Sequence, residues 1–325
     1  MTRIALDIGA TKFAAARVRA AADTDSPRPA AAGAAPPGAE FGLGAVHRAD
    51  VPASGVWEVC RELLLGVAGG EPVEVIGIGA AGPVDVTAGV TGPLNIPEWR
   101  SGFPIVDSVR ALFPGATVRF AIDGACLALA EQRAGALRGV PDALAMTVSS
   151  GIGGGILAGG RVLAGRTGNA GHVGHIVVPG EEVPCGCGGF GCVEAVASGL
   201  SSVRWARSRG WRGSNGAELA AAAAAGNSTA QAALERAGTA LGRAVSSAAA
   251  TLDIDVVVIG GGFAASGEPL WKPLRAAVTR HARLGFLRPL RVLHSEITAG
   301  ATLAGAAVLA AGPGADAGDV PEWPA

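Results

Sequence analysis

Four side chains that commonly bind transition metals fall within a short glycine-rich segment of this sequence. They are His175, Cys185, Cys187 and Cys192. Three thiolates and one imidazole form the ligand set of a closed tetrahedral zinc site, and glycines between the cysteines let the chain turn tightly around an ion. Because no further open ligand is evident, the segment predicts a structural zinc ion rather than a metal that acts as a Lewis acid.

Two other uses of these cysteines fit the sequence less well. A disulfide framework is unusual in a chain with five cysteines and the composition of a cytoplasmic protein. A thioredoxin-like redox site would need a CxxC motif, which the sequence lacks. His172 and Glu194 flank the four ligands, and polar groups on a rigid metal-bound segment could hydrogen-bond to a sugar.

Three glycine-rich turns, each following an apolar run, could bind phosphate groups. Their sequences are DIGATK at 7–12, SSGIGGG at 149–155 and IGGGF at 259–263. Glycine allows backbone N–H groups to approach phosphate oxygens closely, although each turn alone is as typical of an ordinary hairpin or strand–helix connection. None of the three matches the P-loop or the dinucleotide-binding fingerprint.

The first of these turns carries further groups suited to ATP. A divalent cation could lie near Asp7, while Thr11 and the turn amides contact phosphate oxygens. Lys12 is one of only two lysines in the chain. Its place inside a glycine turn is consistent with phosphate binding and also with an ordinary surface lysine.

Asp123 stands at the junction of an apolar strand and a helix, and two interpretations of it are open. Aspartate is a favoured N-cap residue, so it could do no more than begin the helix. A carboxylate at the carboxyl end of a strand also lies where open α/β sheets bind ligands. There it could accept the proton of a substrate hydroxyl that attacks a phosphoryl group.

Length and charge narrow the class of protein. The chain has 325 residues, enough for two domains, and its 26 basic and 27 acidic residues leave no electrostatic footprint for nucleic acid or an anionic membrane. The amino-terminal sequence reaches Asp7 after a short apolar run, unlike a signal peptide, and no apolar run is long enough to span a bilayer. We expect a globular cytoplasmic protein that binds neither nucleic acid nor membrane.

Strand and helix patterns alternate in both halves of the chain, which indicates an α/β fold. The expected helices lie at 57–69, 124–137, 216–251, 268–282 and 301–312. A segment rich in alanine, proline and glycine predicts a flexible loop at 21–44, and the tail at 313–325 is expected to be disordered. Pro93 and Pro97 predict a loop without regular structure at 90–100.

In this order, the motifs DIGATKFAAARV, FAIDGACLALAE, TVSSGIGGGIL and GHVGH…CGCGGFGCVEAVASG resemble the ROK family of bacterial sugar kinases and related repressors. The resemblance covers about residues 3–311, and the GH…CxCGxxGCxE pattern is highly specific. It implies the actin-like, hexokinase-type ATPase fold, in which two α/β domains close on ATP and sugar. The expected domains are 1–120, with a helix at 299–311 packing back on it, and 121–298, which carries the zinc site.

The resemblance also implies roles for single residues. Asp123 matches the catalytic base. The positions that match sugar contacts, together with the neighbouring histidine, are Asn95, His172, His175 and Glu194. The positions that match nucleotide contacts are Gly9, Thr11, Lys12, Gly151, Gly153, Gly154, Gly155, Gly260, Gly261 and Gly262. The implied cofactors are ATP, Mg²⁺ and a structural Zn²⁺, and the family is usually homodimeric.

Four positions depart from the pattern of the family. Ile122 replaces the Asn that usually precedes the catalytic Asp, which removes one contact to a sugar hydroxyl. Ala125 replaces a second Asn, and Ala10 replaces a common glycine. His172 stands where glucokinase-like members have Glu and resembles the bacterial N-acetylmannosamine kinases. Ile122 and His172 together favour an amino or N-acylamino hexose, such as N-acetylmannosamine or kanosamine, over glucose.

Three functions follow from these residues. The first is ATP-dependent phosphorylation of the 6-hydroxyl of a hexose or amino hexose, with glucokinase as the alternative substrate assignment. A sugar-sensing repressor would need an N-terminal DNA-binding domain, for which a phosphate turn at Asp7 leaves no room. Ile122 suggests a catalytically silent sugar-binding protein, but the retained Asp123 and the three glycine turns favour an enzyme.

Overall fold

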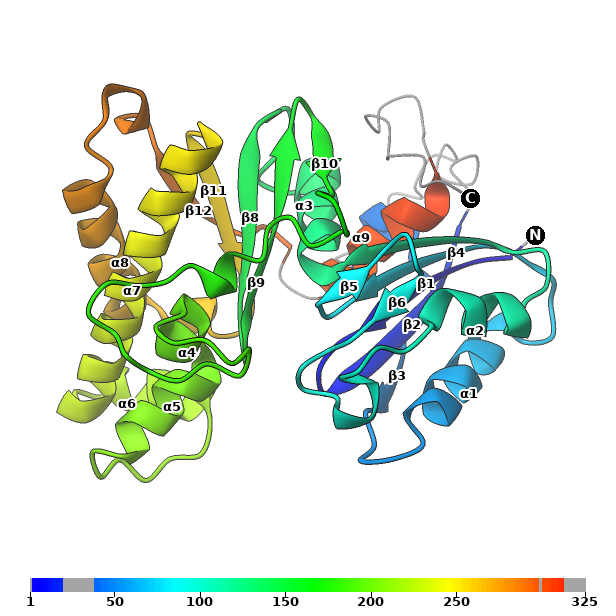
Figure 1. Ribbon diagram of the computed structural model, residues 1–325, viewed down its shortest axis with the longest axis horizontal. Helices are drawn as coiled ribbons and strands as arrows, with labels where there is room; N and C mark the ends of the chain where they lie inside the picture. The colour runs from blue at the N-terminus through cyan, green and yellow to red at the C-terminus, as the bar shows by residue number, and fades with distance from the viewer. Residues whose placement is uncertain (1, 20–37, 298–299, 313–325) are drawn as a thin grey trace, which may run out of the picture. The chain divides into compact units, whose positions relative to one another are not determined.

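The computed structural model describes residues 2–19, 38–297 and 300–312, whose helices and strands are shown in Figure 1. The chain divides into two compact units that alternate along the sequence. Unit 1 comprises Met1–Gly139, Gly155–Ala170 and Ala299–Ala325, and unit 2 comprises Val140–Gly154 and Gly171–Thr298. This division differs from the domain boundary expected at residue 120, because the helix that follows packs within unit 1.

Unit 1 is built on a mixed sheet of order β3-β2-β1-β4-β7. The strands are β1 (Thr2–Ile8), β2 (Lys12–Val18), β3 (His47–Asp50), β4 (Val73–Ala80) and β7 (Thr117–Ile122). β1 and β2 form the hairpin predicted around the GATK turn, whereas β4 runs parallel to both β1 and β7. The carboxyl ends of β1, β4 and β7 therefore meet at one edge of the sheet.

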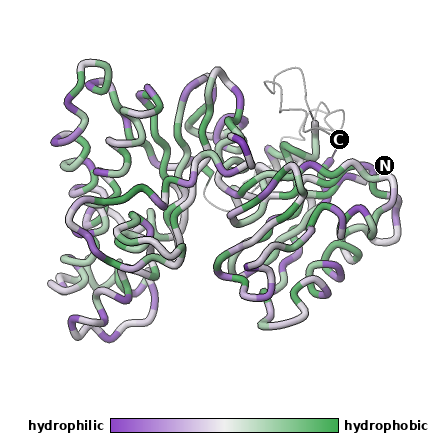
Figure 2. Tube along the Cα trace, viewed as in Figure 1, coloured by the Kyte–Doolittle hydropathy of each residue, from purple (hydrophilic) through white to green (hydrophobic). Residues whose placement is uncertain are grey.

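Helices cover both faces of this sheet. They are α1 (Val56–Ala68), α2 (Ile105–Leu112), α3 (Asp123–Ala134) and α9 (Ala301–Ala311). On one face α1 and α2 join the apolar cluster that contains Leu6 and Ile78, and hydrophobic and hydrophilic residues alternate along α1 as expected for a half-buried helix (Figure 2). On the other face α9 packs on α3, β1 and β4. Gly77 makes this close approach possible, because a Cβ there would overlap the backbone carbonyl of Ala306.

The segment 90–100 in unit 1 corrects one sequence prediction. It contains β6 (Val90–Thr91), which pairs with β5 (Val84–Asp85), and the 3-10 helix η3 (Pro97–Trp99). The prediction of a loop without regular structure was wrong. Pro97 is the first residue of η3, a position where a missing N–H costs no intrahelical hydrogen bond.

The predicted flexible loop at 21–44 lies mostly outside the described residues, as does the predicted tail at 313–325. The described end of the loop is not a surface loop. It forms the 3-10 helix η2 (Ala39–Phe41), in which Phe41 is buried, and the N–H of Gly44 donates to the carbonyl of Arg17 at 2.9 Å.

The second five-stranded sheet has the order β10-β9-β8-β11-β12. Its strands are β8 (Ala143–Val148), β9 (Ile152–Ala158), β10 (Arg161–Leu163), β11 (Val256–Gly260) and β12 (Arg291–His294). β8, β11 and β12 run parallel, and β9 pairs with β10 in the antiparallel sense. The carboxyl ends of its parallel strands share an edge, and two of the predicted glycine turns begin there.

The remaining helices belong to unit 2. They are η4 (Val173–His175), α4 (Val193–Ala197), α5 (Gly199–Arg207), α6 (Gly216–Ala224), α7 (Ser228–Leu252), η5 (Ala264–Ser266), α8 (Glu268–His281) and η6 (Gly285–Leu287). The helical region predicted at 216–251 is divided, because the side chain of Asn227 caps a new helix at its N-terminus. α7 lies directly along α8, where a Cβ at Gly238 would overlap the carbonyl of Leu270.

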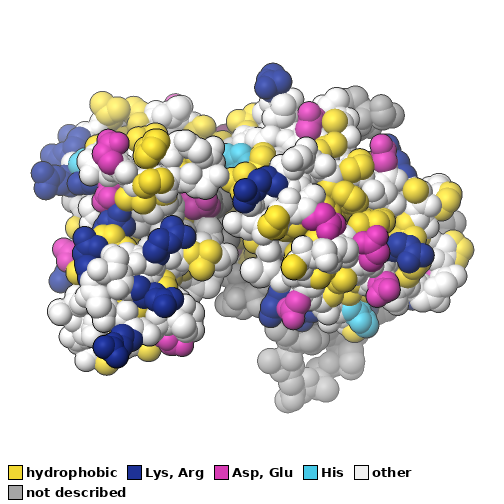
Figure 3. Space-filling model, turned by 60° about the horizontal axis from the view of Figure 1, so that its bottom comes forward, with side chains coloured by type: hydrophobic (Ala, Val, Ile, Leu, Met, Phe, Trp, Pro, Cys, Tyr) yellow, Lys and Arg dark blue, Asp and Glu magenta, His cyan; other side chains and the backbone are white. Residues whose placement is uncertain are grey.

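Strands and helices alternate in both units, so the predicted α/β class is confirmed. Within the described residues, no helix combines the length and the apolar character needed to cross a bilayer. Acidic and basic side chains both occur on each unit of the face drawn in Figure 3.

Candidate functional site

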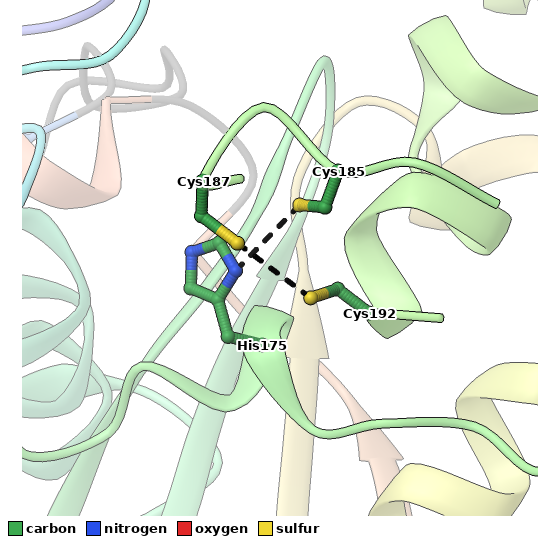
Figure 4. Close-up of side chains that lie close together, drawn as sticks. All are labelled: His175, Cys185, Cys187 and Cys192. Atoms are coloured by element: carbon green, nitrogen blue, oxygen red, sulfur yellow. Dashed lines mark hydrogen bonds between the residues drawn. The ribbon is translucent and has the colours of Figure 1, made fainter. Parts of the chain in front are cut away.

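The four predicted metal ligands converge in unit 2, where their side chains point toward one another (Figure 4). His175 ends η4, Cys192 immediately precedes α4, and Cys185 and Cys187 lie on the loop between them. Nδ1 of His175 is 3.8 Å from Sγ of Cys185, and Sγ of Cys187 is 3.8 Å from Sγ of Cys192. All four ligand atoms lie within 4.8 Å of one another.

This arrangement fits zinc. Tetrahedral bonds of about 2.0–2.3 Å place neighbouring nitrogen and sulfur ligands roughly 3.5–3.8 Å apart, which agrees with the two measured separations. Backbone pairing holds the loop in this shape: Val177 forms a bridge with Cys192, and Pro184 forms one with Phe190. Three cysteines and one histidine also complete the tetrahedral set without a water ligand, as in structural zinc sites.

His172 lies beside this cluster. It directly precedes η4, and its ring centroid is 5.7 Å from that of His175 with the two rings edge to face. Burial, and secondarily the charge of His175, lowers the pKa of His172, so its imidazole is neutral at pH 7. A neutral imidazole offers one hydrogen-bond donor and one acceptor.

Glu194, the second polar residue near the cysteines, is fixed by a backbone group of the second glycine turn. It occupies the first turn of α4, two residues after Cys192. Its Oε2 accepts the N–H of Ile152 at 2.8 Å. A Cβ at Gly151 would lie only 2.7 Å from the same oxygen, so the turn approaches Glu194 as closely as glycine allows.

Unit 1 brings two predicted carboxylates, Asp7 and Asp123, into the same region. Asp7 lies on β1 opposite Gly79 of β4, and a Cβ at Gly79 would lie 2.8 Å from Sγ of Cys126 in α3. The missing side chain at position 79 therefore lets α3 pack closely next to Asp7. Asp123 is the first residue of that helix.

The electrostatics of Asp7 follow from this packing. Burial, and then the negative charge of Asp123, raises the pKa of Asp7 to about 7, and the charge of Arg48 partly offsets the shift. Arg48 lies in the same row of the sheet, since Asp7 pairs with Ala14 and Ala14 pairs with Arg48. No motif marks Arg48 in the sequence, and only the pairing of β2 with β3 could have identified it.

Asp123 begins α3 at the carboxyl end of β7. Its Oδ1 accepts the N–H of Gly124 at 2.7 Å, while the N-cap residue Ile122 makes no side-chain hydrogen bond to the helix. This geometry suits both interpretations of Asp123, the helix end and the proton acceptor. Gly155 packs against the same helix end, because a Cβ there would overlap the carbonyl of Gly124.

The first glycine turn joins β1 and β2 as a tight hairpin. The N–H of Gly9 donates to the carbonyl of Lys12 at 3.1 Å, and the carbonyl of Thr11 accepts the N–H of Val51 at 3.0 Å. Thr11 and Lys12 are both exposed, so their side chains are accessible to a ligand. Asn95 is also exposed, on the turn before η3 in unit 1.

The second and third glycine turns lie side by side in unit 2. The carbonyl of Val148 accepts the N–H of Phe263 at 3.0 Å, and a Cβ at Gly261 would lie 2.6 Å from the same carbonyl oxygen. Gly261 also has a φ of +97°, which favours glycine. The carbonyl of Ser149 accepts the N–H of Gly199, the first residue of α5, at 2.8 Å.

The second turn is shorter than its sequence suggested. β9 begins at Ile152, so Gly153, Gly154 and Gly155 are strand residues, and only Gly151 belongs to the turn itself. Among them, Gly154 packs against neighbouring backbone, since a Cβ there would lie 2.9 Å from the carbonyl oxygen of Ala145. Close packing explains part of this glycine run, and sequence inspection alone does not separate packing from phosphate binding.

Ile122, the most notable departure from the family pattern, lies in the apolar core of unit 1. Its side chain is 2% exposed and belongs to the cluster that includes Phe120 and Val109. It therefore presents almost no surface to a ligand. The substitution removes a polar group from the neighbourhood of Asp123 rather than adding an apolar wall.

The fold, the cysteine and histidine cluster, and the carboxylates with their glycine turns together define a class of protein. The chain has a TM-score of 0.78 and 30% identity to a ROK family glucokinase from Streptomyces griseus in complex with glucose and AMPPNP, covering 95% of this chain and 99% of that one. The two mixed five-stranded sheets with their helices are thus those of the actin-like, hexokinase-type ATPase fold, as predicted.

Sequence comparison is more specific. The ROK family matches residues 68–312. A glucokinase from Thermotoga maritima is 34% identical over 263 residues (76% of this chain, 82% of the relative), and an N-acetylmannosamine kinase from Escherichia coli is 32% identical over 265 residues (80% and 83%). A kanosamine kinase from Amycolatopsis mediterranei is 36% identical over 198 residues (60% and 63%). The chain belongs to the ROK family.

Proposed function

We propose that this protein is an ATP-dependent sugar kinase that phosphorylates the 6-hydroxyl of a hexose, and that its preferred substrate is an amino or N-acylamino hexose. The observation that carries the proposal is the position of Asp123. It stands at the carboxyl end of β7 in the same region as Asp7 and near the edge where the first glycine turn lies. Membership of a family with several sugar-kinase relatives supports the same reaction class.

In the proposed reaction Asp123 accepts the proton of the sugar 6-hydroxyl. The hydroxyl oxygen forms a bond to the γ-phosphorus of ATP, the bond from that phosphorus to the bridging oxygen breaks, and ADP leaves. Asp123 accepts one hydrogen bond from Gly124, which orients its carboxylate on the rigid end of α3. A carboxylate held in this way is suited to a general base.

The triphosphate is proposed to contact all three glycine turns. In unit 1 a magnesium ion near Asp7 would neutralise phosphate charge, with Gly9, Thr11 and Lys12 on the same hairpin. On the other two turns the proposed contacts are Gly151 and the following strand glycines for phosphate, and Gly260, Gly261 and Gly262 toward the adenosine. The hydrogen bond from Phe263 to Val148 keeps those two turns together.

The sugar is proposed to bind Asn95 and Asp123 in unit 1, and His172, His175 and Glu194 in unit 2. A zinc ion held by His175, Cys185, Cys187 and Cys192 would cross-link the segments that carry the unit 2 groups. His175 faces the cysteines with Nδ1, so its second ring nitrogen is the one proposed for the sugar. We also propose a homodimer, for which the mass of the protein in solution is the test.

Two features favour an amino hexose over glucose. Neutral His172 can pair with an amide through one donor and one acceptor, whereas a glutamate at this position would accept hydrogen bonds from hydroxyls. Buried Ile122 supplies no hydrogen bond beside Asp123, so a sugar hydroxyl that needs one is left unsatisfied. Glucose remains the second candidate, because the glucokinase of Thermotoga maritima is as similar to this chain as the N-acetylmannosamine kinase is.

A panel of sugars in an assay of ADP release tests the proposal. N-acetylmannosamine, N-acetylglucosamine, glucosamine, kanosamine, mannose and glucose are compared at equal concentrations, and the product is analysed for the position of the phosphate. We expect 6-phosphorylation of at least one amino hexose. A protein that binds zinc and ATP but phosphorylates no sugar in the panel would instead be a sugar-sensing member of the family.

A further inference from the structure

The residue Ile152 connects the metal-binding segments of unit 2 to the second glycine turn. It is the first residue of β9 and directly follows Gly151. Its N–H donates to Oε2 of Glu194, which stands two residues after the metal ligand Cys192. Its carbonyl packs against Gly174, which precedes the ligand His175, and a Cβ at Gly174 would overlap that carbonyl oxygen.

Both polar groups of the Ile152 backbone are thus in contact with metal-binding segments. The N–H contacts the segment that carries Cys192, and the carbonyl contacts the segment that carries His175. His175 is the first of the four cluster residues in the sequence and Cys192 is the last, with Cys185 and Cys187 between them. They are joined to each other as well, since the N–H of Val193 donates to the carbonyl of Ile176 at 2.8 Å. A metal ion bound by all four ligands would hold the two segments at a fixed separation around Ile152.

The rest of the turn is held by backbone hydrogen bonds. Ser149 donates to the carbonyl of Gly151 at 2.9 Å and accepts from Gly199, and Val148 accepts from Phe263. The carboxylate of Glu194 therefore adds a side-chain hydrogen bond, through the N–H of Ile152, to the main-chain hydrogen bonds of this turn. A hydrogen bond to a charged acceptor is stronger than one between neutral groups.

We infer that Glu194 is a positioning residue for nucleotide: through Ile152 it holds the Ser149–Gly151 turn in the conformation that binds phosphate. This inference rests on the proposed kinase function and extends it. The proposed role of Glu194 in sugar binding predicts no change in nucleotide affinity when sugar is absent. The positioning role predicts that nucleotide affinity depends on Glu194 without any sugar present.

The test measures the affinity of ADP with magnesium by calorimetry in the absence of sugar. Glu194→Ala is expected to weaken ADP binding about tenfold, because the turn loses a charge-assisted hydrogen bond. Glu194→Gln keeps an oxygen that can accept from Ile152 and is expected to stay within about twofold of wild type. Glu268→Ala, on the exposed surface of α8, is the control and should leave the affinity unchanged. Zinc content and unfolding temperature are measured for each variant to show that it is folded and metal-bound.

A double-mutant cycle with Gly151→Ala separates this role from direct blocking of the phosphate. The new Cβ would lie 2.7 Å from Oε2 and displace the carboxylate from the N–H of Ile152. Gly151→Ala should therefore weaken ADP binding several-fold in the wild type and much less in the Glu194→Ala background. Equal losses in both backgrounds would mean that the methyl group blocks the ligand itself, and the inference would be wrong.

The remaining outcomes distinguish the inference from the proposed function. If Glu194→Ala binds ADP as tightly as wild type, or if Glu194→Gln binds it as weakly as Glu194→Ala, the positioning role is refuted while the kinase function stands. If wild type binds ADP with the expected dependence on Glu194 but phosphorylates no sugar, the kinase function fails and the positioning role holds. If wild type does not bind ADP, both are refuted.

Discussion

The two units hold their proposed functional groups by opposite physical means. Unit 1 relies on close packing: glycines at 77 and 79 admit α9 and α3 onto the sheet, and the packing leaves Asp7 buried near a second carboxylate. Unit 2 relies on cross-links: backbone hydrogen bonds join its two glycine turns, and the four proposed zinc ligands converge from the segments that carry His172 and Glu194.

Because of this difference, we expect the two units to respond to different changes in conditions. The packing of unit 1 places like charges close together, an arrangement that a cation can relieve. Unit 2 also gathers like groups, since the sulfur atoms of Cys185, Cys187 and Cys192 lie within 4.8 Å of one another, but these are the proposed ligands of a metal. Their segment is short and glycine-rich and has little core of its own. We therefore expect unit 1 to be sensitive to charge and pH, and unit 2 to be sensitive to loss of metal.

The largest expected effect is on turnover, from a change in unit 1. Asp123→Asn should lower kcat by at least about 100-fold and leave the sugar KM within several-fold, because the amide keeps the shape and the hydrogen bond from Gly124 but loses the base. Steady-state kinetics with the best sugar of the panel measures this. The exposed Asp107→Asn on α2 is the matched control.

Near-normal turnover of Asp123→Asn would mean that Asp123 only forms the end of a helix and does not accept the proton. Asparagine serves that position almost as well as aspartate, so a purely structural role predicts little change. The proton acceptor would then have to be another group, and the proposed catalytic role of unit 1 would be wrong.

Loss of the metal is the next largest effect and belongs to unit 2. We expect about one zinc per chain in the purified protein, and Cys187→Ser should lower zinc content and reduce the unfolding temperature by about 5–10 °C. Elemental analysis and calorimetry measure the two quantities. Glu182→Gln, an exposed non-ligand on the same loop, should change neither. A folded, active protein without metal would contradict the zinc assignment.

Substrate choice is proposed to depend on Ile122 in unit 1 and His172 in unit 2, and the expected preference is about tenfold. An amino or N-acylamino hexose should be preferred over glucose by at least about 10-fold in kcat/KM. Ile122→Asn should narrow the preference only where the new amide turns out of the apolar cluster and reaches a sugar hydroxyl beside Asp123, with Ile122→Val as the control. Because Ile122 is 2% exposed in an apolar cluster, the new amide should also cost about 1–3 kcal/mol of stability. Wild-type protein that uses glucose best would instead be a glucokinase.

The smallest effect concerns the pH dependence of the stability of unit 1. The pKa of Asp7 is raised from 3.8 to about 7, so the folded protein binds a proton there that the unfolded chain releases. This contribution to stability is complete below pH 4 and is lost as the pH rises through about 7. Asp7→Asn cannot ionise, so it should raise the unfolding temperature by about 3–8 °C at pH 8 and much less at pH 5.

Thermal unfolding of ligand-free protein, in buffers without divalent cations, gives this comparison. Asp107→Asn should change the unfolding temperature by the same small amount at both pH values, since that side chain is exposed. An equal effect of Asp7→Asn at pH 5 and pH 8 would mean that the burial of charge is not the source of the change.

The sequence by itself determined the class of the fold, the four side chains that form the candidate metal cluster, and the family. These rest on local patterns: alternation of apolar strands and helices, ligand types at close spacing, and short motifs in a fixed order. Such patterns survive without tertiary information because hydrogen-bond periodicity and ligand chemistry act over a few residues. The end of the second turn and the helix at Pro97 were missed, since both depend on neighbouring segments.

The tertiary structure alone decided how these groups act on one another. Arg48 reaches Asp7 only through the pairing of three strands, and Glu194 reaches Ile152 across a long stretch of sequence. Whether Ile122 faces a ligand or the core depends on the side of the sheet on which residue 122 falls. Charge interaction, burial and close packing depend on distance in space, which the order of residues along the chain does not specify.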